Sequence, residues 1–454
     1  MGTGPAGHRD RLIFRALAAI AFIVLLFFAR SMTFRTDDWD LILNRSLLDP
    51  ISLLPPHNEQ WVTLPAVVFR VIFAAVALHS YLPYLVALLC AHLFAAAGLG
   101  RLVGALSGPL PGLLASVIVL FLGSACEVLG QAIGLGVVLG TGAGLWAIDA
   151  LAIRERPGHA VLFLLASLMS HPGGVVFLAL ALVIGVIEMR QALTWLLVPV
   201  VAFAGWLVLF DLPALAQRSA VLSRNVVEIP PFIVGGIAAA TGAVFGLEPI
   251  VGLVSLAVLV YAGYRFRRRP AYPIIVLASV LGLACLYALI AISRGQTGTL
   301  SLLWSRYFYL GVPLMLLAVA AWFGRPAAIV PGRRSRLAPV LIGLTVVAVV
   351  GNLRYYMLAL DKLMESTHQT RATIAIALWE PDLHVWVQPL ALPGPDGTRQ
   401  VVAAFGNPTH DSLVPIVVPP VPADVSLAVC RFLIAGEDRQ AACREAVARG
   451  VGGP

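Results

Sequence analysis

The run "LIFRALAAIAFIVLLFFARSM" at residues 12–32, followed at once by "FRTDDWD" at 34–40, decides the class of this protein. An apolar run of this length is sufficient to cross the hydrocarbon core of a bilayer. It is longer than the apolar part of a signal peptide and no small-residue cleavage site follows it, so we expect a retained first span. Three carboxylates, Asp37, Asp38 and Asp40, then stand where the chain leaves the membrane.

The composition extends this interpretation to the whole chain. Apolar residues make up 59% of the 454 residues and charged residues only 12%, and the mean hydropathy is +0.91. These values exclude an ordinary soluble protein and predict an all-α polytopic membrane protein embedded in the lipid bilayer. The net charge of +8 comes from arginines that lie between apolar runs. That distribution is typical of membrane topology, so we expect no nucleic-acid partner.

Arginine clusters predict the topology, because basic residues concentrate in cytoplasmic loops. We expect about eleven transmembrane helices in the cytoplasmic membrane, with the N-terminus inside and the C-terminal part outside. The clusters are Arg9 to Arg15, Arg101, Arg154 and Arg156, Arg190, and residues 265–269 and 332–336. The expected spans are 12–32, 82–102, 109–123, 130–150, 158–170, 173–189, 192–210, 247–264, 271–293, 305–323 and 337–356.

Two apolar segments are expected not to span. Residues 62–79, within the long outer loop 33–81, carry Arg70 in their middle and predict a juxtamembrane helix lying in the interface. Residues 231–246 are rich in glycine and alanine. If either segment crossed the bilayer, every later loop would change side and the arginine pattern would fail.

The C-terminal part differs in character from the rest. We divide the chain into a transmembrane domain, 1–356, and a small α+β extracytoplasmic domain, 357–454. Residues 378–408 alternate and carry Pro-Gly and Asp-Gly turn signals, which predicts a few strands, and 423–449 predict a helix. Cys430 and Cys443 lie in this domain, where an oxidising compartment would permit a disulfide.

Polar residues gather on the expected outer face. A carboxylate there can take a proton from a hydroxyl nucleophile. We favour Asp38 as the base, then Asp37, with Glu127 of the next outer turn as a third catalytic candidate; the alternative is a solvated loop capped by Thr36. Arginine is suited to phosphate, and an aromatic ring can stack on a sugar. The expected substrate-binding residues are His57, Glu59, Trp39, Gln131, Arg294, Trp304, Arg306 and Tyr307.

Several of these residues have a simpler interpretation. Trp304 and Tyr307 also fit an interfacial aromatic belt, and Arg306 also fits a headgroup anchor. His171 beside Pro172 fits a kink. Asp37, Asp38, Glu59 and Glu127 would together offer oxygen ligands suited to magnesium, manganese or calcium, although their spacing requires no metal.

The layout resembles the GT-C superfamily of integral membrane glycosyltransferases, and it is similar to actinobacterial polytopic membrane proteins. The pieces that carry the resemblance are Asp37 and Asp38 after the first span, "PPHNEQW" at 55–61, the segment 62–79, Arg101, and Glu127 at the second outer turn. The chain departs from that pattern in Glu127, where many members have aspartate, and in its Pro-Pro-His order. The resemblance implies a polyprenyl-phosphate sugar donor and an acidic residue acting as base on the acceptor hydroxyl.

The sequence therefore predicts a membrane glycosyltransferase. It would move a sugar from a polyprenyl-phosphate donor to a glycan or lipid-linked acceptor of the cell envelope, for cell wall biogenesis. Two alternatives stay open. One is a transporter or flippase for a lipid-linked solute, which would want ionisable residues at mid-membrane. The other is a non-catalytic membrane protein of envelope assembly that acts through its C-terminal domain.

Overall fold

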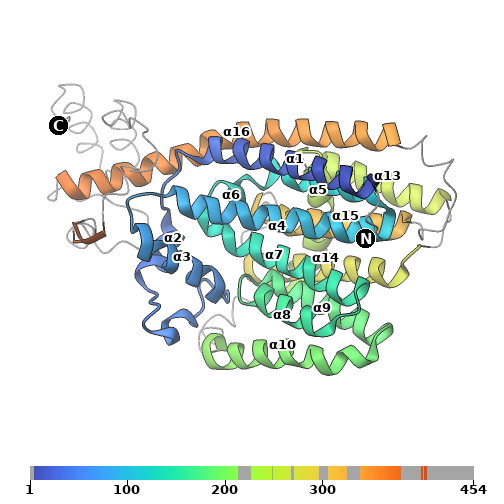
Figure 1. Cartoon of the computed structure of the whole chain (residues 1–454), viewed down its shortest axis with the longest axis horizontal. Helices are drawn as coiled ribbons and strands as arrows, with labels where there is room; N and C mark the ends of the chain where they lie inside the picture. The colour runs from blue at the N-terminus through green and yellow to red at the C-terminus, as the bar shows by residue number, and fades with distance from the viewer. Residues whose placement is uncertain are drawn as a thin grey trace.

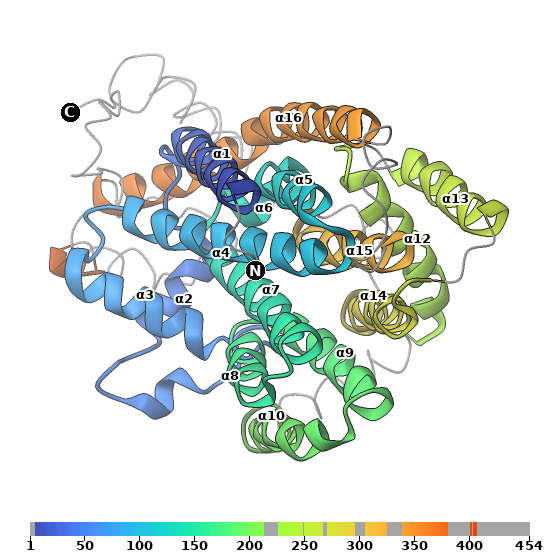
Figure 2. The ribbon, with the colours of Figure 1, turned by 45° about the vertical axis from the view of Figure 1, so that its right-hand side comes forward.

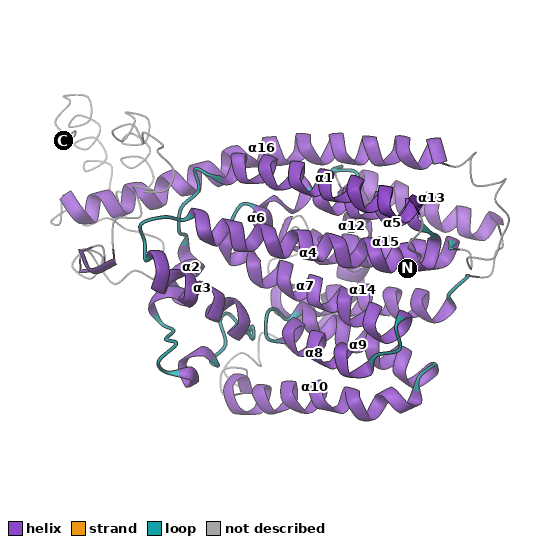
Figure 3. Ribbon diagram, in the orientation of Figure 1, coloured by secondary structure: helices purple, strands orange, loops and turns teal. Residues whose placement is uncertain are grey.

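A computed structural model describes residues 5–212, 226–247, 249–266, 270–295, 305–324, 338–379, 400–401 and 403–405. Those residues are almost entirely helical (Figure 3), and they contain no strand beyond one isolated bridge between His57 and Gln60. In a bilayer the helix satisfies every backbone donor and acceptor within its own segment, which is why so apolar a chain adopts it.

The long helices lie side by side and form one bundle (Figure 1). Its helices include α1 (Pro5–Ala29), α4 (Leu82–Ser107), α5 (Pro109–Leu120), α7 (Leu135–Ile148), α8 (Pro157–Leu168), α9 (Gly173–Ile187), α10 (Leu193–Trp206), α13 (Pro249–Phe266), α14 (Pro273–Arg294), α15 (Phe308–Phe323) and α16 (Ala338–Trp379). Short helices α2 (Thr36–Leu43), α3 (Thr63–Val76) and α6 (Cys126–Leu129) lie toward one end. We call this the site end.

Within the described residues, nine helices are long and apolar enough to cross a membrane, which confirms an all-α polytopic membrane protein. Eight of them coincide with expected spans, and the other three expected spans correspond to shorter apolar helices, Pro157–Leu168, Gly173–Ile187 and Val251–Tyr261. The nine are Arg9–Ala29, Leu82–Ser107, Pro109–Leu129, Ala132–Ile153, Arg190–Asp211, Val226–Ala243, Pro273–Arg294, Ser305–Phe323 and Ala338–Met364.

One of these nine helices, Val226–Ala243, departs from the arginine-based expectation. Residues 231–246 were expected to stay out of the bilayer, yet α12 (Ile229–Ala243) belongs to a segment with the length and apolarity of a span. The middle of α12 lies against α14, where Gly236 leaves room for the ring of Tyr287. Its end meets α16, where Asn352 donates to the carbonyl of Ala243. Figure 2 shows α12 between these two helices.

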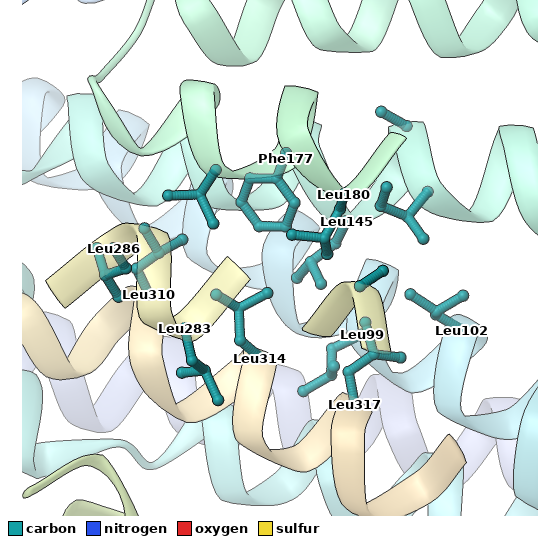
Figure 4. Packing of buried hydrophobic residues seen from close by; sticks show 14 of the residues in the cluster. Leu99, Leu102, Leu145, Phe177, Leu180, Leu283, Leu286, Leu310, Leu314 and Leu317 are labelled. Atoms are coloured by element: carbon teal, nitrogen blue, oxygen red, sulfur yellow. The ribbon is translucent and has the colours of Figure 1, made fainter. Parts of the chain in front are cut away.

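Two buried apolar clusters hold the bundle together. One packs α4, α7, α9, α14 and α15 against each other through leucines and Phe177 (Figure 4). The other lies around the site end and contains Trp39, Tyr81, Leu122 and Tyr356. Burying such side chains against one another excludes lipid and fixes the relative positions of the helices that carry the candidate site.

The C-terminal part begins inside a helix. The expected boundary at 356/357 falls within α16, which continues to Trp379 and buries Leu363 against Gly130. Residues 400–401 and 403–405, within the stretch 378–408 that was expected to contain a few strands, are helical, and the carbonyl of Phe405 accepts the N–H of Leu78. The remaining expected strands, the helix 423–449, Cys430 and Cys443 lie outside the described residues.

Candidate functional site

The acidic stretch after the first span forms the first turn of α2. The expected N-cap, Thr36, is instead the first helical residue, and Arg35 is the N-cap. The carboxylate of Asp38, three residues on, accepts the backbone N–H of Arg35 at 2.9 Å. This bond satisfies a donor that a helix start would otherwise leave unpaired, so one acid of the cluster has a structural task.

Asp38 is completely buried. Its Oδ2 atom also accepts the hydroxyl of Tyr81 at 3.1 Å, while Oδ1 has no hydrogen-bond partner among the described residues. Burial raises the pKa of Asp38 to about 7, against the lowering effect of the Arg35 and Tyr81 bonds. A group this deeply enclosed cannot touch a substrate without a rearrangement of α2.

Asp37 faces the other way and keeps 45% of its side chain exposed. Its Oδ1 atom lies 3.6 Å from Nε2 of His57, and the Oδ2 atom of Asp40 lies 2.8 Å from Nδ1 of the same ring. The adjacent His57 ring holds the pKa of Asp37 below its usual value. Asp37 therefore stays ionised and accessible, as a base in contact with substrate must be.

His57 is an imidazolium held between two carboxylates. Burial by itself would lower its pKa, but Asp37 and Asp40 outweigh burial and raise the pKa of His57 to about 9. For Asp40, burial by itself would raise the pKa, but His57, Asn44 and Arg45 outweigh burial and hold the pKa of Asp40 far below its usual value. The site thus keeps a fixed positive charge beside Asp37 at neutral pH.

A tight turn presents His57. The N–H and C=O groups of His57 and Gln60 exchange hydrogen bonds of 3.0 and 2.9 Å. The two residues between them have positive φ angles, +47° at Asn58 and +69° at Glu59. Asparagine tolerates this region, whereas glutamate is strained there, and such strain often accompanies functional sites.

A second group of polar residues approaches from α6 and from the 3₁₀ turn η10 (Ser305–Tyr307), which precedes α15. The Nε atom of Arg306 lies 3.8 Å from Oε2 of Glu127, and both side chains are close to half exposed. The hydroxyl of Ser305 accepts the backbone N–H of Glu127 at 2.9 Å. Arg306 lies close enough to Asp37 for its charge to help lower the pKa of that carboxyl. The structure therefore brings acids and arginine together from three distant parts of the chain.

Other expected residues fall into four groups. Tyr307 lies beside Arg306, with its ring centroid 5.7 Å from the guanidinium carbon, and Arg294 reaches its hydroxyl. Gln131 and Glu59 are partly exposed near the same end. Trp39 is a correction to the expectation, because it is buried against Phe34 in the core and cannot stack on a sugar. Trp304 lies outside the described residues.

The four acids that would suit a magnesium, manganese or calcium ion do not form a ligand group in the structure. Across the described residues, no group of three or more His, Cys, Asp and Glu side chains is placed to hold a metal ion. Asp38 and Asp37 explain why, since neighbouring residues on a helix point in different directions. One of them enters the core while the other faces the site.

Two positioning residues escaped the sequence reasoning. The hydroxyl of Tyr81 accepts the N–H of Ala132 at 2.7 Å and so joins the loop 33–81 to the turn that follows Glu127. Arg70, in the middle of the segment expected to lie in the interface, donates to the carbonyl of Ile42 in the last turn of α2. A cation there complements the negative end of the helix dipole. The only sequence signal was their location beside the acidic loop.

Comparisons of the chain with protein-family models, with curated proteins and with solved structures found no match in any of the three.

Proposed function

We propose that this protein is a membrane glycosyltransferase that moves a sugar from a polyprenyl-phosphate donor to a cell-envelope acceptor. The observation that carries the proposal is the pairing of an exposed, ionised Asp37 with Arg306 and Glu127 at one end of a transmembrane bundle. A base for a hydroxyl and a guanidinium for a phosphate are the two groups that such a transfer needs.

In the proposed reaction the acceptor oxygen forms a bond to the anomeric carbon of the donor. The bond from that carbon to the phosphate oxygen breaks, and the polyprenyl phosphate leaves with the bonding electrons. The acceptor proton passes to the carboxylate of Asp37. Arg306 stabilises the phosphate charge, and His57 keeps Asp37 oriented and ionised. No residue of the chain changes oxidation state.

The choice of Asp37 over Asp38 rests on exposure. Asp38, first favoured from the sequence, accepts hydrogen bonds from the N–H of Arg35 and the hydroxyl of Tyr81 inside the core. Its burial suits a positioning residue. The side of the membrane is part of the proposal. Arginine clusters lie at the far ends of α4 and α7, which favours an extracytoplasmic site with the N-terminus inside.

Transfer of radiolabelled sugar tests the proposal. Membranes carrying the native chain, Asp37→Asn or Asp38→Asn at matched expression would be supplied with polyprenyl-phosphate sugars and endogenous envelope acceptors. We expect Asp37→Asn to lose about 100-fold or more of the native rate, because the base is removed. Asp49→Asn, an exposed acid of the same loop, serves as the control and should retain the native rate.

Native activity in Asp37→Asn would remove Asp37 from the mechanism. Failure of the native chain to incorporate label from any donor would overturn the transferase and favour the flippase or the assembly protein. In that case, movement of a fluorescent lipid-linked solute across reconstituted vesicles would separate the two.

A further inference from the structure

A second charged cluster lies at the opposite end of the bundle from the candidate site. It is formed by Arg101 of α4 and by Asp149 and Arg154 at the end of α7. Arg101 is twenty residues along the chain from Tyr81, which is about 30 Å along a helix. The cluster is therefore separate from the proposed transferase site and takes no part in the reaction described above.

The carboxylate of Asp149 is fully buried behind the two guanidinium groups. The Nε atoms of Arg101 and Arg154 lie 2.9 and 2.6 Å from its Oδ2 atom, and these side chains are 28% and 31% exposed. One negative charge thus faces two positive charges. Both guanidinium groups are held by this buried carboxylate, and both keep part of their side chain accessible.

The backbone is locally altered to make this arrangement. Residues Asp149–Ile153 form a π-helix, in which the N–H of Arg154 donates to the carbonyl of Asp149 at 3.1 Å. Residues five apart would point about 140° away from each other on an α-helix, whereas the wider π-turn stacks them. The π-turn is what places Arg154 over Asp149, and such turns occur frequently at functional sites.

An aromatic strip continues from the charges toward the middle of the bundle. The guanidinium of Arg154 lies 5.3 Å from the ring centroid of Trp146. Trp146 is stacked with Phe94 at 5.6 Å and with Phe163 at 6.3 Å between centroids. All three rings are only partly buried, although they come from α4, α7 and α8 of the bundle. A cationic end with an apolar strip behind it is complementary to the anionic headgroup and the acyl chain of a phospholipid.

We propose that this cluster binds one anionic phospholipid. Its phosphate would lie on Arg101 and Arg154, and an acyl chain would lie along Phe94, Trp146 and Phe163. The helices α4 and α7 belong to segments long and apolar enough to cross a membrane, and α8 is a shorter apolar helix beside them. The positive-inside rule accounts for arginines here, but it does not require a carboxylate buried behind them or a π-turn that brings them together.

Lipid retention and affinity test this proposal on the full chain. Native mass spectrometry of protein extracted from membranes would count the bound phosphatidylglycerol, and titration in phosphatidylcholine nanodiscs would give its affinity. We expect one retained lipid, and about fivefold weaker binding in Arg154→Gln, since one basic residue is removed. Asp149 keeps Arg101 in this variant, so the bundle should fold.

Two matched variants separate this site from general surface charge. Arg190→Gln removes an exposed arginine that the topology places on the same side, and it should leave the affinity unchanged. Arg154→Lys keeps the charge and should keep most of the binding. Equal weakening in Arg154→Gln and Arg190→Gln, or none in either, would overturn the proposal. Competition by millimolar inorganic phosphate as effective as that by the lipid would show an anion site without lipid specificity and would overturn it as well.

If Arg154→Gln failed to fold, Trp146→Leu would provide the second test. It keeps all three charged residues and removes the ring beneath Arg154, so the affinity for phosphatidylglycerol should fall. Its affinity for inorganic phosphate should stay unchanged, because that ligand has no acyl chain. Unaltered lipid affinity in this variant would contradict the placement of the acyl chain.

Discussion

Tyr81 donates its hydroxyl proton to the buried carboxylate of Asp38 across 3.1 Å, and its oxygen accepts the backbone N–H of Ala132 across 2.7 Å. One hydroxyl therefore joins the helix of the acidic loop to the turn after Glu127. Asp37 is the chain neighbour of Asp38, and Glu127 lies close to Ala132 in the chain. The distance between the proposed base and the second acid is thus determined by a buried tyrosine.

Tyr81→Phe should destabilise the protein and slow the proposed transfer. The substitution leaves the Asp38 carboxylate with only the Arg35 bond and leaves the Ala132 N–H without its acceptor, which costs about 1–3 kcal/mol for each buried group left unpaired. Thermal unfolding in detergent would measure the loss. Tyr84→Phe is the control, because that hydroxyl makes one 3.3 Å bond to the carbonyl of Ala77. Equal effects in the two variants would contradict the role given to Tyr81.

Asp38→Asn should remove a pH dependence of stability. The pKa of Asp38 is raised from 3.8 to about 7, so the folded protein holds a proton that the unfolded chain releases between these values. Stability contributed by this group is therefore greatest at low pH and is lost as the pH rises toward 7. Asparagine imitates the neutral acid, so the variant should melt higher than the native chain at pH 8. A lower melting temperature at pH 8 would show that the charged form is required.

His57→Gln should remove a second loss of stability with rising pH, in a higher pH range than that of Asp38. The pKa of His57 is raised from 6.5 to about 9, so its stabilising contribution is fully present below pH 6.5 and is lost as the pH rises through 9. The melting temperature of the native chain should fall toward that of the variant between these pH values. His159→Gln, an exposed histidine in another part of the bundle, should follow the native curve. Native and His57→Gln curves that stay parallel would exclude the charged clamp.

Asn352→Leu should destabilise the bundle more than a typical core substitution. Its side-chain amide donates to the carbonyls of Ala243, Val244 and Ala348, and its carbonyl accepts the N–H of Ser124 at 2.8 Å. Leucine has a similar volume but leaves these buried groups unpaired, at a cost of roughly 3 kcal/mol or more. Thermal unfolding would measure it, with Asn44→Ala on the surface as the control. A change below that of the control would contradict the role of this node.

Much of the fold was predictable because it follows from chain composition. Runs of about twenty apolar residues become helices, since a bilayer offers no partner to an open backbone, and eight expected spans were found on that basis. The residues of the candidate site were also predictable as a set, because polar groups beside apolar runs are few. Asp37, His57, Glu127 and Arg306 are such groups.

Their roles were not predictable in the same way. Asp37 and Asp38 are adjacent and chemically identical, and only the rotation of α2 sends one to solvent and the other to Tyr81. Trp39 was expected at the substrate and lies in the core for the same reason. The path of α12 was also missed, because a rule about loop charges carries no information on how a helix packs against Tyr287 and Asn352.

The sequence by itself determined that this chain is a helical membrane protein with acids and arginines at the ends of its spans. Those properties depend on the hydrophobicity of short segments, which is local. The tertiary structure alone decided which acid is exposed, that His57 is clamped between two carboxylates, and that Asp149 is buried behind Arg101 and Arg154. Burial and ion pairing are properties of contacts between distant segments, and they exist only once the helices have packed.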